Sequence, residues 1–187
     1  MLTMHDATLP ANVRLGPNSI ITGDCLTRDR AFRLFRSRLD PGLVIGAGCT
    51  MDGVMFNAGP EARIEIGDHC HFHEATLISD LAIRVGCRVV IGWHATVIDA
   101  DFHPMDAAAR MADAVACSPL GRGAPRRPFE RRPVVIEDDV WIGPNATILK
   151  GVRVGARAWV EPGAVVVSDV PPDSRVLGNP ARVVAEP

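Results

Sequence analysis

Residues 136–166 read IEDDVWIGPNATILKGVRVGARAWVEPGAVV, and the apolar pattern of this stretch repeats every six residues. A helix would space its apolar residues about 3.6 apart and a flat strand would alternate them, so neither gives this period. A six-residue period predicts a solenoid in which each unit buries one large aliphatic side chain on a shared axis. The first positions are Ile136, Ile142, Ile148, Val154, Val160 and Val166, and the small fifth positions are Val140, Ala146, Val152, Ala158 and Ala164.

The same phase extends upstream, which predicts one continuous coil over most of the chain. We expect three units to form one turn, with a short strand on each side of a triangle and a turn at each corner. Neighbouring turns should be stacked about 4.8 Å apart, and the chain should hold about five or six of them. The upstream units are Ile66-Phe72-Ile78, with Cys70 and Thr76 at fifth positions; Val85-Ile91-Val97, with Val89 and Ala95; Ile45-Met51, with Cys49 and Met55; and Leu15-Ile21, with Ser19 and Cys25.

Composition agrees with one all-β domain over residues 1–187. Hydrophobic residues make up 47% and aromatic residues only 5%, as a narrow core of Ile, Val and Ala requires. A net charge of -2 argues against nucleic acid or an anionic membrane as partner. No apolar run has the length of a signal peptide or a membrane span, and the five cysteines form no CxxC pair. We therefore expect a cytoplasmic protein with reduced, packed thiols.

Two segments interrupt the coil. In residues 27–40, Phe32, Phe35 and Leu39 have helical spacing among arginines, which predicts a short amphipathic helix packed over an end or edge of the coil. Residues 100–133 leave the coil altogether before it resumes in register. Loops longer than about 12–15 residues are uncommon in compact domains unless they are functional or disordered. Prolines between Pro119 and Pro133 argue against a helix in that part of the loop.

The long loop opens with IDADFHPMD and is followed by IEDDVWIGPNATILKGVRVG and by SDVPPDSRVLGNPARVV. Over residues 66–184 this arrangement resembles the hexapeptide-repeat acetyltransferases, and most closely the maltose, galactoside, nodulation-factor and polysaccharide O-acetyltransferases. The resemblance implies a left-handed parallel β-helix. It also implies an acetyl-CoA-dependent enzyme that acetylates a hydroxyl of a saccharide or polysaccharide precursor, with no metal.

His103 is the candidate general base, because it matches the catalytic histidine of the family. Attack of a hydroxyl on a thioester requires removal of the hydroxyl proton, and an imidazole with a pKa near 6.5 suits that task at neutral pH. Pro104 should fix the backbone directly after it. Asp99 and Asp101 are the candidates for orienting the ring, and the alternative reading of both is that they are solvated loop acids.

The family resemblance also implies a homotrimer whose active sites lie between subunits. It places the acceptor wall at His71, His73 and Asp80, although several sugar acetyltransferases carry Asn or an aromatic residue where His71 and His73 stand. Many relatives also have Ser or Ala at the position of Pro144 and lysine at that of Ser168. The residues that the resemblance assigns to the CoA side are Trp141, Gly143, Pro144, Pro162, Ser168 and Arg182.

The segment GRGAPRRPFERRP is basic and proline-rich, and two interpretations stay open for it. One is a phosphate clamp for CoA or for a nucleotide-linked acceptor, and the other is a strap packed across a neighbouring subunit. Its arginines are Arg122, Arg126, Arg127, Arg131 and Arg132.

Three other functions compete with O-acetylation. N-acetylation of a nucleotide-linked amino sugar uses the same scaffold. The γ-type carbonic anhydrases share the solenoid and bind zinc through three histidines, which makes His69, His71, His73 and His94 worth weighing, but no His-x4-His pair is present. A non-enzymatic assembly solenoid is the third, and the loop histidine and the C-terminal motif argue against it.

Overall fold

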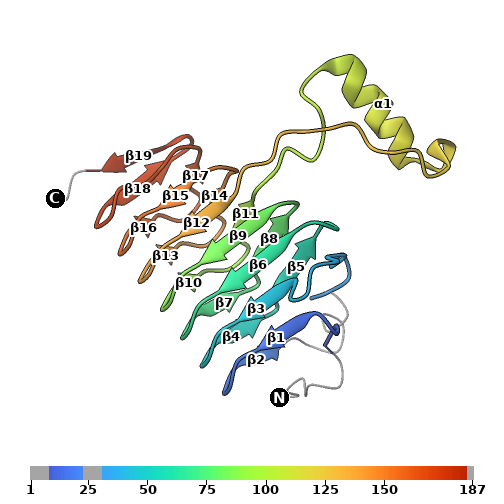
Figure 1. Ribbon diagram of the computed structural model, residues 1–187. Coiled ribbons are helices and arrows are strands. Elements are labelled where there is room, and N and C mark those ends of the chain that lie inside the picture. Colours follow the sequence, from blue (N-terminus) through green and yellow to red (C-terminus); the bar gives the residue numbers. More distant parts are fainter. Residues whose placement is uncertain (1–8, 23–30, 185–187) are drawn as a thin grey trace.

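The computed structural model describes residues 9–22 and 31–184, which form three mostly parallel β-sheets and one α-helix. From β3 to β17 the chain visits the three sheets in strict rotation, so each set of three strands makes one coil (Figure 1). The first sheet holds six strands, the second eight and the third five. Each strand of the first sheet belongs to a different coil, so its six strands agree with the predicted five or six coils.

All pairings within the sheets are parallel except the last, because β18 and β19 form an antiparallel hairpin at the C-terminal edge of the second sheet. The first sheet contains β1 (Val13–Leu15), β3 (Leu43–Ile45), β6 (Arg63–Ile66), β9 (Ala82–Val85), β12 (Val134–Ile136) and β15 (Arg153–Val154). The second contains β2 (Ile20–Thr22), β4 (Thr50–Asp52), β7 (His71–His73), β10 (Val90–Ile91), β13 (Trp141–Ile142), β16 (Trp159–Val160), β18 (Arg175–Gly178) and β19 (Ala181–Val184). The third contains β5 (Met55–Ala58), β8 (Thr76–Ser79), β11 (Thr96–Ile98), β14 (Thr147–Ile148) and β17 (Val165–Val166).

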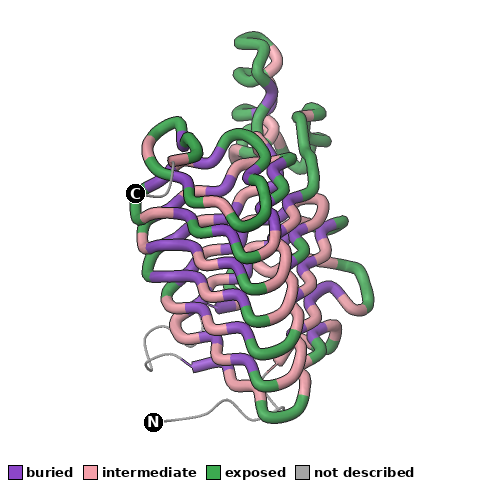
Figure 2. Tube along the Cα trace, turned by 90° about the vertical axis from the view of Figure 1, so that its left-hand side faces the viewer, coloured by how far each residue is buried: buried purple, intermediate pink, exposed green. Residues whose placement is uncertain are grey.

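The core is a column of aliphatic side chains along the axis of the coil, and buried segments recur on each of its sides (Figure 2). All first and fifth positions predicted between residues 136 and 166 are buried. Cys49 and Cys70 fill fifth positions as buried free thiols, as predicted, whereas Cys25 lies outside the described residues. The period of six therefore reports which side chains point inward.

The predicted phase is wrong at one corner of two coils. The inward residue after Phe72 is Leu77, five positions on, instead of the predicted Ile78, and the inward residue after Met51 is Phe56, also five positions on. The turns between the second and third sheets are one residue shorter here, with Gly53 or Glu74 at positive φ in the corner. Val54 and Ala75 consequently take the buried corner positions that were assigned to Met55 and Thr76.

The helix predicted over residues 27–40 is wrong where the structure describes it. Residues 31–40 form turns and an isolated bridge between Phe35 and Ala58, and residues 27–30 lie outside the described residues. Phe32 stacks on Phe56 with ring centroids 5.8 Å apart, and both Phe32 and Phe35 pack against the core. Contact with the edge of the coil thus holds these aromatic residues without a helix.

The excursion at residues 100–133 contains α1 (Ala107–Cys117) and a short 3-10 turn, η2 (Pro119–Gly121). We call residues 100–133 the arm, since α1 stands away from the coil in Figure 1. Asp106 caps the helix by accepting a hydrogen bond from the Ala109 N–H at 2.8 Å. This helix was not predicted, although the alanine-rich run after Asp106 favours one. Within the described part of the chain, no helix is long and apolar enough to cross a membrane.

Candidate functional site

The base of the arm is closed by backbone pairing across its two ends. Ala100 and Arg131 form an antiparallel bridge, the Asp101 N–H donates to the Glu130 carbonyl at 2.9 Å, and the Arg132 N–H donates to the Asp99 carbonyl at 2.8 Å. These contacts fix the point from which the arm leaves the coil, between β11 of the third sheet and β12 of the first. His103 lies two residues beyond this closure, on a defined stem.

The imidazole of His103 is held by a carboxylate from α1. Its Nδ1 lies 2.8 Å from Oδ2 of Asp113. The Asp113 side chain is fully buried, whereas half of the His103 side chain surface is exposed. Asp113 is the only buried residue of α1. The helix is therefore held to the rest of the arm mainly by a polar contact.

Arg126 completes the surroundings of Asp113. Its guanidinium donates to Oδ1 at 3.1 Å and to Oδ2 at 2.7 Å, and it also donates to the Phe102 carbonyl. The Arg127 N–H adds a fourth donor to this carboxylate, at 3.1 Å from Oδ1. Chiefly the hydrogen bond from Arg126, and then those from His103 and Arg127, hold the pKa of Asp113 well below its usual range, although burial acts in the opposite direction.

This arrangement fixes the tautomer of His103. Because the low pKa keeps Asp113 ionised, its carboxylate can only accept hydrogen bonds, and Nδ1 must therefore carry the proton of the shared bond. In the neutral ring Nε2 then has a free lone pair. A neutral His103 is thus prepared to take a proton at Nε2, and Asp113 stabilises the imidazolium that results.

The two acids predicted to orient His103 make other contacts in this chain, and the carboxylate beside the imidazole is that of Asp113. Asp99 is fully buried and accepts hydrogen bonds from the Ser79 hydroxyl at 2.6 Å and from the N–H groups of Asp80 and Leu81 at 2.7 and 2.9 Å. Asp101 pairs with Lys150 at 3.0 Å. Asp113 could have been found in the sequence, because it is the only acid in the alanine-rich run that follows the cap.

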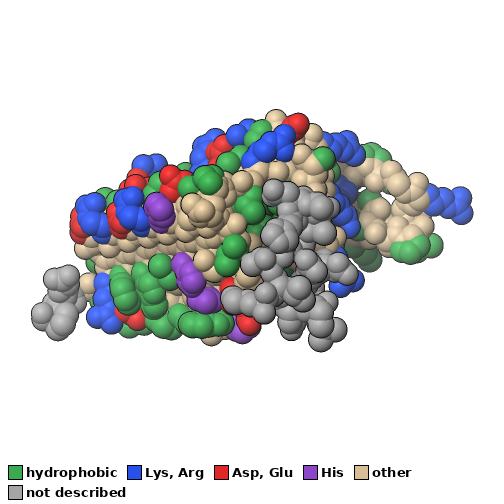
Figure 3. Space-filling view, turned by 90° about the horizontal axis from the view of Figure 1, so that it is seen from below, with side chains coloured by type: hydrophobic (Ala, Val, Ile, Leu, Met, Phe, Trp, Pro, Cys, Tyr) green, Lys and Arg blue, Asp and Glu red, His purple; other side chains and the backbone are tan. Residues whose placement is uncertain are grey.

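The outer face of the second sheet carries a row of aromatic and histidine side chains, which Figure 3 shows as histidines beside exposed hydrophobic groups. Trp141 stacks on Trp159 with ring centroids 4.0 Å apart. His73 stacks on Trp93 at 4.6 Å. The Nε2 atoms of His71 and His73 lie 2.5 Å apart, so one ring must donate to the other. Burial, and then the neighbouring His73, lower the pKa of His71. Trp93 and Trp159 were not predicted as site residues.

Most residues predicted for the CoA side form one strip. Trp141 begins β13, and Gly143, Pro144 and Pro162 lie at the corner between the second and third sheets. Pro144 and Pro162 occupy matching positions on adjacent coils, since the Gly163 N–H donates to the Pro144 carbonyl at 2.9 Å.

The other two CoA-side residues lie apart from this strip. Arg182 lies on β19 at the edge of the second sheet. Ser168 follows β17 and precedes the bridge from Val170 to Val154, so it lies at a different corner, between the third and first sheets.

The residues predicted for the acceptor do not gather within one chain. His71 and His73 lie on β7 in the second sheet, whereas Asp80 follows β8 on the side from which the arm leaves. Burial raises the pKa of Asp80, although Arg131 opposes this shift. Asp80 lines a pocket between the arm and the third sheet, which we call the arm pocket, together with Phe102 and Arg126.

The basic segment is partly committed to contacts within the chain. Arg126 binds Asp113, Arg131 pairs with Glu61 at 2.9 Å and with Asp80 at 3.4 Å, and Arg132 pairs with Glu130 at 2.9 Å. Arg122 ends η2 at positive φ and does not line the arm pocket. Arg126, Arg131 and Arg132 therefore hold the arm together, whereas the side chains of Arg122 and Arg127 enter no ion pair in the described part of the chain.

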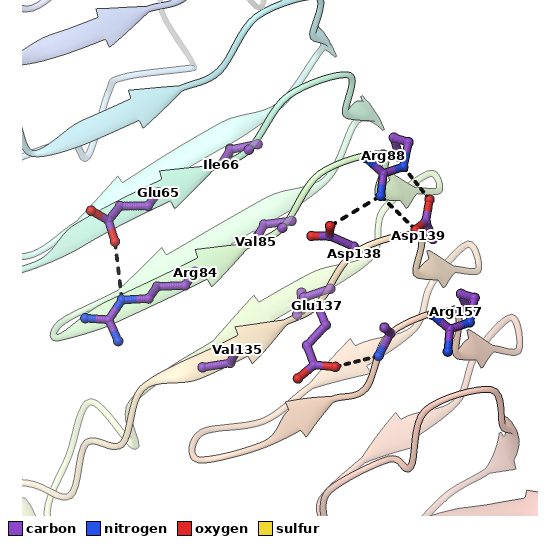
Figure 4. A pocket seen from close by; sticks show the side chains of 14 residues that line it. Glu65, Ile66, Arg84, Val85, Arg88, Val135, Glu137, Asp138, Asp139 and Arg157 are labelled. Carbon is purple, nitrogen blue, oxygen red and sulfur yellow. Dashed lines mark hydrogen bonds and ion pairs between the residues drawn. The ribbon is translucent and has the colours of Figure 1, made fainter.

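A second groove lies over the first sheet, and its charged side chains pair with one another (Figure 4). Arg84 pairs with Glu65 at 3.3 Å, and Arg88 pairs with Asp138 at 3.3 Å and with Asp139 at 2.6 Å. Paired surface charges of this kind are typical of a solvated face. Residues 9–22 and 31–184 hold no group of three or more His, Cys, Asp or Glu side chains that could bind a metal ion.

Comparison with known proteins places this coil among bacterial transferases. The model of the family "Bacterial transferase hexapeptide (six repeats)" matches residues 133–170. The crystal structure of a hexapeptide-repeat-containing acetyltransferase, VCA0836 from Vibrio cholerae, is 32% identical with a TM-score of 0.60, and the match covers 83% of this chain and 76% of that one. The chain belongs to the hexapeptide-repeat family of bacterial transferases.

Two other proteins that are similar to this hexapeptide-repeat protein are named as N-acylating enzymes. A 2,3,4,5-tetrahydropyridine-2,6-dicarboxylate N-acetyltransferase of Brevibacillus brevis is 52% identical over 59 residues, which are 32% of this chain. This match spans only 25% of that enzyme, so the chain matches about a quarter of the length of its curated relatives. AntD, an N-acyltransferase from Bacillus cereus, shares the fold at 16% identity and a TM-score of 0.64, over 91% of this chain and 82% of that one.

Proposed function

We propose that this protein transfers an acetyl group from acetyl-CoA to a hydroxyl of a saccharide or polysaccharide precursor. The contact between His103 and Asp113 carries the proposal, because it fixes Nε2 as a proton acceptor on a half-exposed ring. A structure of the Vibrio cholerae relative, at 28% identity and a TM-score of 0.52, contains acetyl-CoA, and the match covers 93% of this chain and 70% of that one. This supports acetyl-CoA as the donor.

In the proposed reaction, Nε2 of His103 removes the proton of the acceptor hydroxyl as its oxygen attacks the thioester carbonyl. The new C–O bond forms, the C–S bond breaks, and the proton on Nε2 passes to the departing CoA sulfur. Asp113 stays ionised and holds the imidazolium in place. The proton transfer would contribute about 10²- to 10⁴-fold to the rate, and positioning of the two reactants can contribute on the order of 7–11 kcal/mol.

We infer a homotrimer with each site between two subunits. In one chain the strip of Trp141, Pro144 and Pro162 lies at the end of the second sheet and its corner with the third, while His103 projects from the corner between the third and first sheets. Only an arm from a neighbouring chain would bring a His103 to this strip. The family also implies that the coil is left-handed, and we extend that hand to this chain.

N-acetylation is the second candidate, favoured by the 52% identity to the Brevibacillus brevis N-acetyltransferase over 59 residues. A thiol-release assay with acetyl-CoA, run against neutral saccharides, charged sugars and amino-sugar nucleotides, separates the two. Hydroxyl acetylation that falls by at least about 10²-fold in His103→Ala would support the proposal.

His69→Asn is the matched control for this assay. His69 is an exposed histidine at positive φ on a distant corner, a conformation that Asn also adopts readily. Wild-type rates in His103→Ala with a hydroxyl acceptor would overturn the base assignment. Failure of the wild-type protein to release thiol with any acceptor would overturn the function itself.

A further inference from the structure

The arm pocket lies beside the proposed base within the same chain. Its walls come from the end of β8, the turn after β5 and the arm. Phe102 directly precedes His103, and Arg126 bonds both Asp113 and the Phe102 carbonyl, so the pocket wall and the support of the imidazole are made by the same residues. A molecule in this pocket would reach the immediate surroundings of His103.

Positive charge is in excess around this pocket. Four arginines line it, Arg36, Arg126, Arg127 and Arg131, against two acids, Glu61 and Asp80. Arg131 pairs with both acids, at 2.9 Å and 3.4 Å. Arg126 is bound to Asp113, just outside the lining. Once these pairs are set aside, Arg36 and Arg127 remain, and neither pairs with an acid within residues 9–22 and 31–184. They leave local positive charge on a chain whose net charge is -2.

The rest of the lining is mostly apolar and partly aromatic, with Asn57 and Ser79 as its uncharged polar residues. The rings of Phe102 and Phe129 lie 6.2 Å apart, and the Arg126 guanidinium lies 5.0 Å from the centre of the Phe129 ring. This cation–π contact helps to hold Phe129 in the wall. The pocket therefore offers an apolar surface to a ring and guanidinium groups to an anion, a combination that a neutral saccharide would not require.

We propose that the arm pocket binds an anionic group of the acceptor, a phosphate or a carboxylate, through Arg127 with help from Arg36. Guanidinium groups bind both anions through paired N–H donors. This inference rests on the proposed function and deepens it, because it assigns the acceptor to the charged sugars. Arg127 is well placed for this role, since its backbone N–H already binds Asp113 and ties the side chain's position to that of the base.

Calorimetric binding in the absence of acetyl-CoA tests the inference without relying on turnover. The probes are glucose 1-phosphate, UDP-N-acetylglucosamine, glucuronate and glucose, and the variants are Arg127→Gln and the double variant Arg36→Gln/Arg127→Gln. Loss of charge-assisted hydrogen bonds should weaken binding of a charged probe by about 10- to 100-fold, and added salt should weaken wild-type binding. Arg122→Gln removes one charge from the same arm outside the pocket and should bind as wild type does.

The probes also identify the source of the anion. Binding of the phosphate-bearing sugars alone assigns a phosphate, and binding of glucuronate alone assigns a carboxylate. Equal affinity for glucose and the charged probes would overturn the inference, and so would unchanged binding in the double variant. A rise in the KM for acetyl-CoA with no change for the acceptor would also overturn it, by assigning the arginines to CoA phosphates. Thiol release with neutral saccharides would leave the proposed function standing in each of these cases.

Discussion

His103 and Asp113 lie ten residues apart in the chain, yet Nδ1 of the first is 2.8 Å from Oδ2 of the second. The contact exists because the chain turns at Phe102, which has positive φ, and α1 then begins at Ala107 and carries Asp113 back over His103. Arg126 approaches the same carboxylate from the segment of the arm that returns to the coil. The base, its orienting acid and the cation that keeps this acid ionised therefore belong to one substructure.

Replacement of Asp113 by Asn should impair catalysis with little effect on acceptor binding. The amide keeps the shape of the carboxylate but loses its charge, so the ring can adopt the tautomer with the proton on Nε2. We expect kcat to fall by about 10²- to 10⁴-fold, with a smaller change in KM.

A loss of folding could imitate this result, so Asp113→Asn is measured beside Arg126→Lys. Lysine keeps a positive charge near Asp113 without the paired N–H donors, and it should lower kcat less than Asp113→Asn does. Wild-type kcat in Asp113→Asn would contradict the orienting role.

Acidification should weaken the fold through His71. Burial and His73 lower the pKa of His71, so the unfolded chain binds more protons than the folded one between the lowered value and the ordinary value near 6.5. Stability therefore rises with pH in this range and is lost as the pH falls through it. Denaturant unfolding from pH 8 to pH 5 should show this decline, and His71→Gln should flatten it. Equal slopes in the two proteins would contradict the assignment.

Replacement of Asp99 by Ala should destabilise the coil where the arm begins. It removes the acceptor of the Asp80 and Leu81 N–H groups and of the Ser79 hydroxyl. An unsatisfied buried polar group costs about 1–3 kcal/mol, so a clear drop in the unfolding midpoint is expected. Asp139→Asn, which alters an exposed ion pair with Arg88, should leave the midpoint nearly unchanged.

Enlargement of a fifth position should strain the corner of the coil. Ala164 is fully buried, and leucine there would force neighbouring coils apart. We expect a loss of about 1–3 kcal/mol in the free energy of unfolding. Val167→Leu is the control, because Val167 is exposed and directly follows β17. This substitution should have little effect on stability. An unchanged free energy of unfolding in Ala164→Leu would contradict this prediction, because it would show that the corner can hold a larger side chain.

The coil was predictable because its rule is local. Each inward position is six residues from the next, and burial of Ile136, Ile142 and Ile148 follows from spacing alone. The prediction failed where corner length changed, because the corner at Glu74 is one residue shorter than the later corners of the same edge and the spacing pattern does not show this. In the same way, spacing could not show that Phe32 and Phe35 pack at the edge of the coil without a helix.

The sequence by itself determined the repeat, the extent of the arm and the choice of His103 as candidate base. Only the tertiary structure decided which carboxylate reaches that histidine. Asp99 and Asp101 are nearer in sequence, but Asp99 is buried beneath the turn at residues 79–81 and Asp101 pairs with Lys150. Asp113 reaches His103 because a helix folds back across the arm and Arg126 offsets the desolvation of its charge. Periodicity records which side chains are buried, whereas a polar site depends on distances between segments that no local pattern contains.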